Sequence, residues 1–384
     1  MERREFLRNF VQGSGLLLAQ GLVLPSIFLS QTAEASSDLS FQRYLVTAHT
    51  DKDLKHYLDF DKKISKPIDG EIHILDLAHQ SLRKVDVPAY CHGFAQHPIN
   101  TNVIFGVEKW GNRAIVFDLK TGKVLQSLKA PENFRYFGHG AFDPSGQKLY
   151  TSASRYDSNL NAVLVYNTKT WTHEQSIELG HVESHEIRLR DDGRSFLIAT
   201  RFRHHFDNKE LDSGGELVEI NISDNKIIRR YPVPFADHIL RISSDVYVVG
   251  TSISRPHSNA YAMDLKKGSV LDLRDASGYD PEFMNGETLS AGKIDSDHVV
   301  MTIPASQMFF IWNIKTNQVI KQKAEGWDNG VAVVADSQFI VTSGDNGDIK
   351  SYKFISNKIV SPDDVFNEKK VKLGNGRHVY LFTS

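Results

Sequence analysis

Seven copies of one short segment recur along the chain, and this repeat limits the possible fold more than any other feature. Each copy places a His or Asn among small polar residues, and successive copies are 44 to 53 residues apart. The seven anchor residues are His92, His139, His185, His238, Asn285, Asn329 and Asn375. A period of about 40–50 residues in β-rich sequence is typical of propeller blades. Because equivalent positions of all blades face one axis, we expect the anchors to form a central ring.

Each repeat also contains the residues of four short strands. A β-rich run such as Phe196–Ala199 follows the anchor after about ten residues. A second run often ends on Asp or Asn, as in Ile115–Asp118, and a polar turn such as Lys120–Gly122 comes next. Val, Ile, Tyr and Phe favour packed positions in sheets, whereas Gly, Asn and Asp favour turns. The sequence therefore predicts an all-β fold, a seven-bladed β-propeller with four strands per blade.

The two ends of the repeat array predict how the ring closes. Tyr44–Thr47 matches the second strand of a blade and Glu71–Asp76 matches the third, so the N-terminal blade lacks a first strand. The last copy, Asn375 to Leu381, has the sequence of a first strand and no blade of its own. An open sheet edge at this seam would be a site for aggregation. We therefore expect the C-terminal strand to join the N-terminal blade.

Residues 1–35 have the features of an export signal. The pair Arg3-Arg4 stands before Phe-Leu and a further arginine, a pattern that resembles the twin-arginine motif. A short apolar stretch with Pro25 follows, and Ala33-Glu34-Ala35 fits a cleavage site. The alternative is a membrane-anchoring helix, but the apolar run is short. The sequence predicts export to the periplasm, removal of residues 1–35, a propeller over 36–384 and no stable membrane span in the mature protein.

The net charge limits the classes of partner, and the cysteine content limits how the fold can be stabilised. The formal net charge is −2, which gives no reason to expect a nucleic-acid partner. Cys91 is the single cysteine, so the chain cannot form an intramolecular disulfide. The propeller must therefore be stabilised by its apolar core.

The anchor histidines are the candidate metal ligands. His92, His139, His185 and His238 would lie on neighbouring inner strands, and imidazole is a common ligand of Fe, Cu and Zn. Glu183 alternates with His185 in an extended segment, so both side chains can share a face and Glu183 can complete the site. The alternative is a purely structural ring, because three of the seven anchors are Asn, a poor ligand for these metals. The sequence leaves both interpretations open.

A second candidate site lies on the loops between the second and third strands, which we expect on the same face as the anchors. In blades three to five these loops are rich in cations: Arg155, Arg201, Arg203, His204, Arg255 and His257. Such an arc predicts binding of an anionic small ligand or of an acidic surface on a periplasmic protein. The alternative is an ordinary solvated loop surface.

Several segments resemble a known group of proteins. They are Arg3-Arg4, Phe137–Gly146 with its Gly-His-Gly, Ser184–Gly193 with its His-Glu-x-Arg, and Trp327-Asp328-Asn329. Together they resemble exported bacterial seven-bladed propellers without assigned function that are encoded beside imelysin-like proteins in iron-responsive gene clusters. The resemblance implies a periplasmic role near metal uptake, and it implies no particular reaction.

The sequence favours a binding protein over an enzyme. The mature chain has no Gly-x-Ser-x-Gly, no His-Glu-x-x-His, no phosphate loop and no dinucleotide fingerprint. The leading expectation is a periplasmic propeller that binds a ligand or partner on its loop face and takes part in handling a transition metal. Two alternatives stay open: a metal-dependent or lactonase-like enzyme, and an interaction scaffold whose axial ring is structural.

Overall fold

A computed structural model describes most of the chain beyond residue 42. The described residues are 43–50, 68–79, 81–155, 158, 160–180, 183–201, 214–234, 236–250, 259–282, 284, 288–323, 328–334, 339–344, 347–360, 372–373 and 378–384. The expected signal at residues 1–35 therefore lies outside them.

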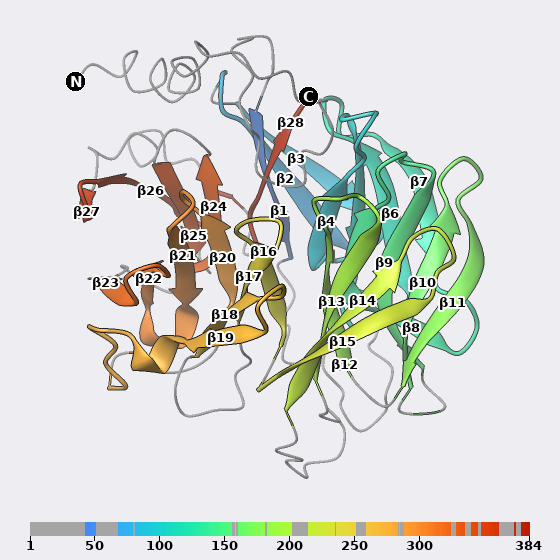
Figure 1. Cartoon of the computed structure of the whole chain (residues 1–384). Coiled ribbons are helices and arrows are strands. Elements are labelled where there is room, and N and C mark those ends of the chain that lie inside the picture. The colour runs from blue at the N-terminus through green and yellow to red at the C-terminus, as the bar shows by residue number, and fades with distance from the viewer. Residues whose placement is uncertain are drawn as a thin grey trace, which may run out of the picture.

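The described strands form seven four-stranded antiparallel sheets, arranged as the blades of one ring (Figure 1). Blade one contains β28 (Tyr380–Thr383), β1 (Arg43–His49), β2 (Gly70–Asp76) and β3 (Ser81–Val87). Blade two contains β4 (Gly93–Gln96), β5 (Val103–Val107), β6 (Arg113–Asp118) and β7 (Val124–Lys129). Blade three contains β8 (Phe134–Phe142), β9 (Lys148–Arg155), β10 (Asn161–Asn167) and β11 (Thr172–Gly180). Blade four contains β12 (Glu183–Leu189), β13 (Ser195–Arg201), β14 (Gly215–Asn221) and β15 (Ile227–Val233).

The remaining blades repeat this order. Blade five contains β16 (His238–Arg241), β17 (Val246–Gly250), β18 (Ala260–Asp264) and β19 (Ser269–Asp272). Blade six contains β20 (Ser290–Lys293), β21 (His298–Ile303), β22 (Met308–Asn313) and β23 (Gln318–Lys323). Blade seven contains β24 (Asp328–Val334), β25 (Phe339–Gly344), β26 (Ile349–Ile355) and β27 (Lys358–Val360). Two 3₁₀ turns, Leu273–Asp275 and Pro304–Ser306, complete the regular structure of the described residues, where no helix is long and apolar enough to cross a membrane.

The predicted seven-bladed propeller and its closure are both confirmed. Strand β28, from the C-terminus, pairs antiparallel with β1, in the register Tyr44↔Phe382 and Val46↔Tyr380. Figure 1 shows the red C-terminal strand beside the blue N-terminal one. The last strand of the chain thus supplies the inner strand that the N-terminal blade lacks.

Apolar packing between neighbouring blades holds the ring together. The buried apolar residues of the described part form seven clusters, and each cluster joins two adjacent blades. Successive residues of a middle strand face opposite neighbours, because side chains alternate along a strand. In β13, Phe196 and Ile198 pack toward blade three, whereas Leu197 and Ala199 pack toward blade five. This double burial explains why the middle strands read as continuous apolar runs.

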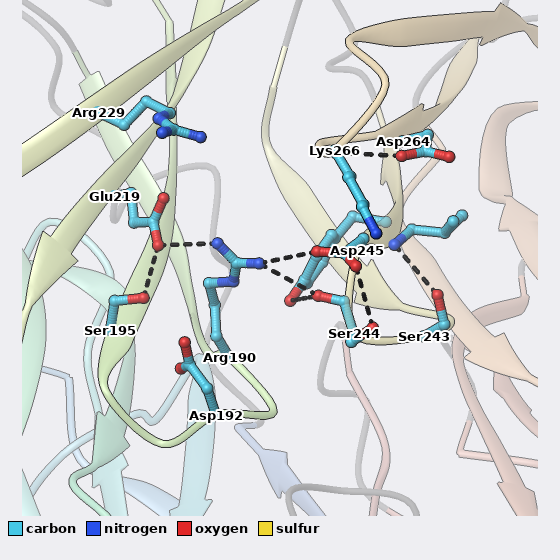
Figure 2. Close-up of polar contacts among 12 residues, drawn as sticks. Arg190, Asp192, Ser195, Glu219, Arg229, Ser243, Ser244, Asp245, Asp264 and Lys266 are labelled. Atoms are coloured by element: carbon cyan, nitrogen blue, oxygen red, sulfur yellow. Dashed lines mark hydrogen bonds and ion pairs between the residues drawn. The ribbon is translucent and has the colours of Figure 1, made fainter.

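A polar link also joins blades four and five, beyond the end of β12 (Figure 2). One Nη of Arg190 lies 2.8 Å from the carboxylate of Glu219 in β14, and the other lies 3.1 Å from Asp245, just before β17. Ser195 donates a hydrogen bond of 2.7 Å to the same Glu219 oxygen. Burial opposes ionisation of Glu219, but the hydrogen bonds from Ser195, Arg190 and Tyr231 outweigh it and lower its pKa. Arg190 therefore bridges blades four and five.

Candidate metal centre

Five histidines from five consecutive blades meet at the propeller axis. Four are predicted anchors, and we call the set His92, His139, His185, His238 and His378 the axial histidine cluster. His92 directly precedes β4, His139 lies in β8, His185 in β12, His238 begins β16, and His378 stands two residues before β28. Neighbouring ring centroids are 4.5 to 5.9 Å apart. Four of the rings are almost completely buried, and His92 is half-buried.

Irregular backbone in the inner strands aims these rings at the axis. The pairing of β8 with β9 shifts register between Tyr136 and Gly140, so His139 lies in a bulge. The pairing of β12 with β13 shifts between Ser184 and Ile187, which places His185 in a second bulge. Bulges of this kind re-aim side chains and are common next to functional sites.

Glycines make room for the rings. Gly138 has φ +104°, a conformation that favours glycine, and a Cβ there would lie 2.6 Å from Cδ2 of His92. A Cβ on Gly93 would lie 2.3 Å from the Gly138 carbonyl oxygen and 3.0 Å from Nδ1 of His139. Small residues at these two positions are thus a condition for the close approach of His92 and His139.

Hydrogen bonds fix the tautomers of two rings. Nδ1 of His185 lies 3.0 Å from the carbonyl oxygen of Phe137, so this nitrogen must carry the proton that it donates. Nε2 of His185 is then an acceptor, and it faces Nζ of Lys109 at 3.4 Å. Nδ1 of His238 lies 3.4 Å from the carboxylate of Glu186. Carbonyl and carboxylate acceptors on Nδ1 are typical second partners of metal-binding histidines, because they orient Nε2 for coordination.

Glu186 is an ionised group beside these rings. Burial opposes its ionisation, but the Arg188 charge and hydrogen bonds from His238 and the Ile239 backbone outweigh that cost. The pKa of Glu186 is thereby lowered to about 2. The cluster therefore has a permanent negative charge next to it.

The electrostatics of the cluster keep three of its rings neutral. Burial, followed by electrostatic repulsion from His238, Arg188 and Lys109, holds the pKa of His139 well below its usual range. Burial is also the main reason that the pKa values of His185 and His378 are lowered well below theirs. Neutral imidazole is the form that binds metals.

Lone pairs in the cluster are close enough to share an ion. Two groups of three rings each bring one ligand nitrogen per ring within 4.8 Å of the others: His92, His139 and His185, and His139, His238 and His378. Nε2 of His92 and Nε2 of His378 are 3.3 Å apart. Nε2 of His139, the residue common to both groups, is buried and has no hydrogen-bond partner among the described residues. His139 is therefore the centre of the arrangement.

Glu183, the predicted fifth ligand, lies in a different set of contacts. Its Oε2 accepts a hydrogen bond of 2.6 Å from Nε of Arg201, and a terminal nitrogen of Arg201 lies 3.0 Å from Asp237. We call these three buried residues the ion cluster. Glu183 belongs to neither histidine group of the described residues. Glu186 is a carboxylate that does contact a ring of the axial cluster, that of His238.

The predicted cationic arc is only partly placed. Arg201 is buried between two carboxylates, and Arg155 is half-buried, 4.0 Å from Glu178 and against the ring of Phe134. The other members, Arg203, His204, Arg255 and His257, lie outside the described residues. Among the members of the arc that the structure describes, Arg155 is therefore the partly exposed one.

The side chains of the three asparagine anchors lie outside the described part of the chain. Asn285 and Asn375 lie outside the described residues, and only the backbone of Asn329, in β24, is described. Cys91 is buried, which raises the pKa of its thiol well above the usual value, and it belongs to neither histidine group of the described residues. His378 is the ligand candidate that sequence reasoning missed. The Arg377-His378-Val379 segment resembles Asp237-His238-Ile239, and this likeness was the available signal.

Comparisons with known proteins agree with the fold and leave the activity open. Residues 85–201, which include His92, His139 and His185, match the model of a family described as a protein of unknown function (DUF1513). This agrees with the predicted resemblance to propellers without assigned function. No curated protein matches the sequence.

Solved propellers are similar in fold but distant in sequence. Hydrazine synthase of Kuenenia stuttgartiensis is 10% identical with a TM-score of 0.56, over 79% of this chain and 94% of that one. A structure of U3-55K is 12% identical with a TM-score of 0.54, over 71% and 81% of the two chains. The WD40 repeats of RRP9 are 12% identical with a TM-score of 0.56, over 74% and 82%. At these identities the likeness shows the fold alone.

Proposed function

We propose that this propeller is a periplasmic metal-binding protein that holds a Cu, Zn or Fe ion in the axial histidine cluster and takes part in handling that metal. The observation that carries the proposal is the buried Nε2 of His139, which has no hydrogen-bond partner among the described residues although it lies among four other imidazoles. Buried polar atoms normally have a partner, and an exception needs an explanation. A bound ion supplies one.

The distances suit imidazole coordination. Two nitrogens that each lie about 2.0–2.1 Å from a tetrahedral ion are about 3.3 Å apart. Nε2 of His92 and Nε2 of His378 have this separation, 3.3 Å. Without an ion, two neutral rings at this distance must share one proton in a hydrogen bond. The same contact becomes a pair of ligands when the donor ring carries its proton on Nδ1 instead, which leaves both Nε2 atoms free to coordinate.

The donor set also limits the class of metal. The cluster offers nitrogen atoms only, which suit Cu, Zn and Fe better than Mg or Ca, whose preferred ligands are oxygens. Glu186 accepts from Nδ1 of His238 and also forms an ion pair with Arg188, so an ionised carboxylate fixes the orientation of this ring. We place the function in the periplasm on the strength of the export signal predicted at residues 1–35.

Metal titration of untagged protein tests this proposal. Calorimetry with Cu²⁺, Zn²⁺ and Fe²⁺ should show a site in the wild type whose affinity falls at least about tenfold in His139→Ala. The control is His79→Gln, which changes an exposed histidine on blade one and should leave the affinity unchanged. Thermal melts of the metal-free proteins accompany the titrations. Equal affinity in wild type and His139→Ala, with a clearly lower melting temperature in the variant, would leave a structural ring and an interaction scaffold.

A further inference from the structure

Blade one contains a second group of metal-ligand residues, away from the axial histidine cluster. Glu71 and His73 are two residues apart in β2, so their side chains share one face of the sheet. His49, at the end of β1, is paired directly with Glu71 in the antiparallel register. Strand pairing thus brings all three side chains to the same face. We propose that His49, Glu71 and His73 form a second site for a divalent transition metal such as Zn²⁺.

The distances within this group fit a shared ion. Nε2 of His73 lies 2.8 Å from Oε2 of Glu71, and the rings of His49 and His73 have centroids 4.9 Å apart. One ligand atom from each of the three residues lies within 4.8 Å of the others. Ligand atoms about 2.0–2.2 Å from a tetrahedral ion are about 3.4 Å apart. The 2.8 Å contact between His73 and Glu71 must therefore lengthen by about 0.6 Å when an ion takes the place of the shared proton.

An unused nitrogen is the second observation in favour of the site. His73 is only 2% exposed, and its Nδ1 is buried without a hydrogen-bond partner among the described residues. The Glu71 side chain is 30% exposed and His49 is half-buried, so solvent reaches one side of the group.

The surroundings favour a binding site with open coordination positions. Two histidines and one carboxylate are the protein ligands of several catalytic zinc sites and of non-haem iron sites. Asp86 of β3 stands opposite Glu71 in the register and supplies a further negative charge on this face, and Lys84 stands opposite His73. Deeper along the same face, Leu45 and Leu75 pack against blade seven, which fixes the two strands that hold the ligands.

The second site is a close neighbour of the axial histidine cluster. Thr47 of β1 donates a hydrogen bond of 2.8 Å to the carbonyl oxygen of His378, and the same Thr47 is the register partner of His73. One strand therefore separates the two sites. The proposal does not depend on metal binding at the axis, and the test below separates the two.

Co²⁺ titration, followed by visible absorption and by equilibrium dialysis, tests the second site in untagged full-length protein. In the His139→Ala background, we expect one Co²⁺ to bind and Glu71→Gln to weaken that binding at least about tenfold. Glu71→Asp, which keeps the carboxylate, should recover part of the affinity. Glu178→Gln, a change of an exposed glutamate in blade three, is the matched control and should have no effect.

Each outcome decides between the sites. Wild type that binds two ions, one lost with His139→Ala and the other with Glu71→Gln, supports both. A single ion lost with Glu71→Gln but kept in His139→Ala supports the second site and overturns the axial one. Co²⁺ binding that is unchanged by Glu71→Gln overturns the second site, as does the absence of any ion in the His139→Ala background. Glu71 is partly exposed, so its substitution tests the site even if His73 variants fail to fold.

Discussion

Two buried polar clusters share strand β12, and they differ in how their polar atoms are satisfied. In the ion cluster, Arg201 lies between the carboxylates of Glu183 and Asp237, so each buried charge is paired with an opposite charge of the protein. In the axial histidine cluster, neutral rings meet, and Nε2 of His139 has no hydrogen-bond partner among the described residues. In the first cluster every charge has a protein partner, and the second keeps a buried ring nitrogen to which the described residues offer none. Burial of polar groups alone does not separate a structural site from a binding site, whereas the pairing of each atom does.

The largest expected effect comes from breaking the ion cluster. Arg201→Met should lower the free energy of unfolding by about 3–5 kcal/mol, because two buried carboxylates lose their counter-charge. Urea unfolding measures this change, and Arg229→Met, on the exposed edge of the same blade, is the control, which should shift stability by less than about 0.5 kcal/mol. A loss below about 1 kcal/mol for Arg201→Met would show that the pairing is not the main support of this region.

A smaller effect concerns the neutrality of the axial histidine cluster. The folded pKa values of His139, His185 and His378 are lowered by burial, whereas unfolded histidine titrates near 6.5. As the pH falls below about 6.5, these histidines bind protons in the unfolded chain but not in the folded protein. The free energy of unfolding therefore decreases as the pH falls. Each such histidine contributes a slope of at most about 1.4 kcal/mol per pH unit.

Removing one ring tests that slope. Urea unfolding between pH 7.5 and 5, with a chelator present to exclude bound metal, should show a shallower loss of stability in His139→Gln than in the wild type below pH 6.5, by up to about 1.4 kcal/mol per pH unit. Glu186 does not interfere, since its pKa is about 2. If the two proteins lose stability in parallel, His139 is not held neutral by the fold.

The fold and most of the axial histidine cluster could be predicted from the sequence because both follow from the repeat. The period places His92, His139, His185 and His238 on equivalent strands of successive blades. Equivalent strands face the same axis, so the prediction does not depend on the conformation of the loops between them. His378 was missed because the small polar residues around Asn375 satisfy the same pattern three residues earlier. The last repeat has no following blade that would have fixed its alignment.

The partners of individual charges could not be predicted. Glu183 and Arg201 were assigned to two different sites, yet the β12–β13 register places them directly opposite each other. That register passes through the bulge between Ser184 and Ile187, and a one-residue change there turns side chains to the other face. The predicted ligand role of Glu183 thus depended on a detail of backbone pairing that the sequence pattern does not contain.

The smallest expected effect concerns Lys109, a lysine that contacts the axial histidine cluster. Nζ of Lys109 lies 3.4 Å from Nε2 of His185, and this is the lone pair that an ion at the cluster needs. Its charge also contributes to the lowered pKa values of His139, His185 and His378. Lys109 therefore competes with a bound cation both for an acceptor and through repulsion.

Lys109→Met should tighten Zn²⁺ or Cu²⁺ binding about fivefold, equivalent to about 1 kcal/mol, as measured by calorimetry at fixed pH and salt. Lys109→Arg, which keeps the charge, should leave the affinity close to that of the wild type. Weaker binding in Lys109→Met would mean that the ammonium group supports the ligand, as expected if an anion rather than a metal ion occupies the axis.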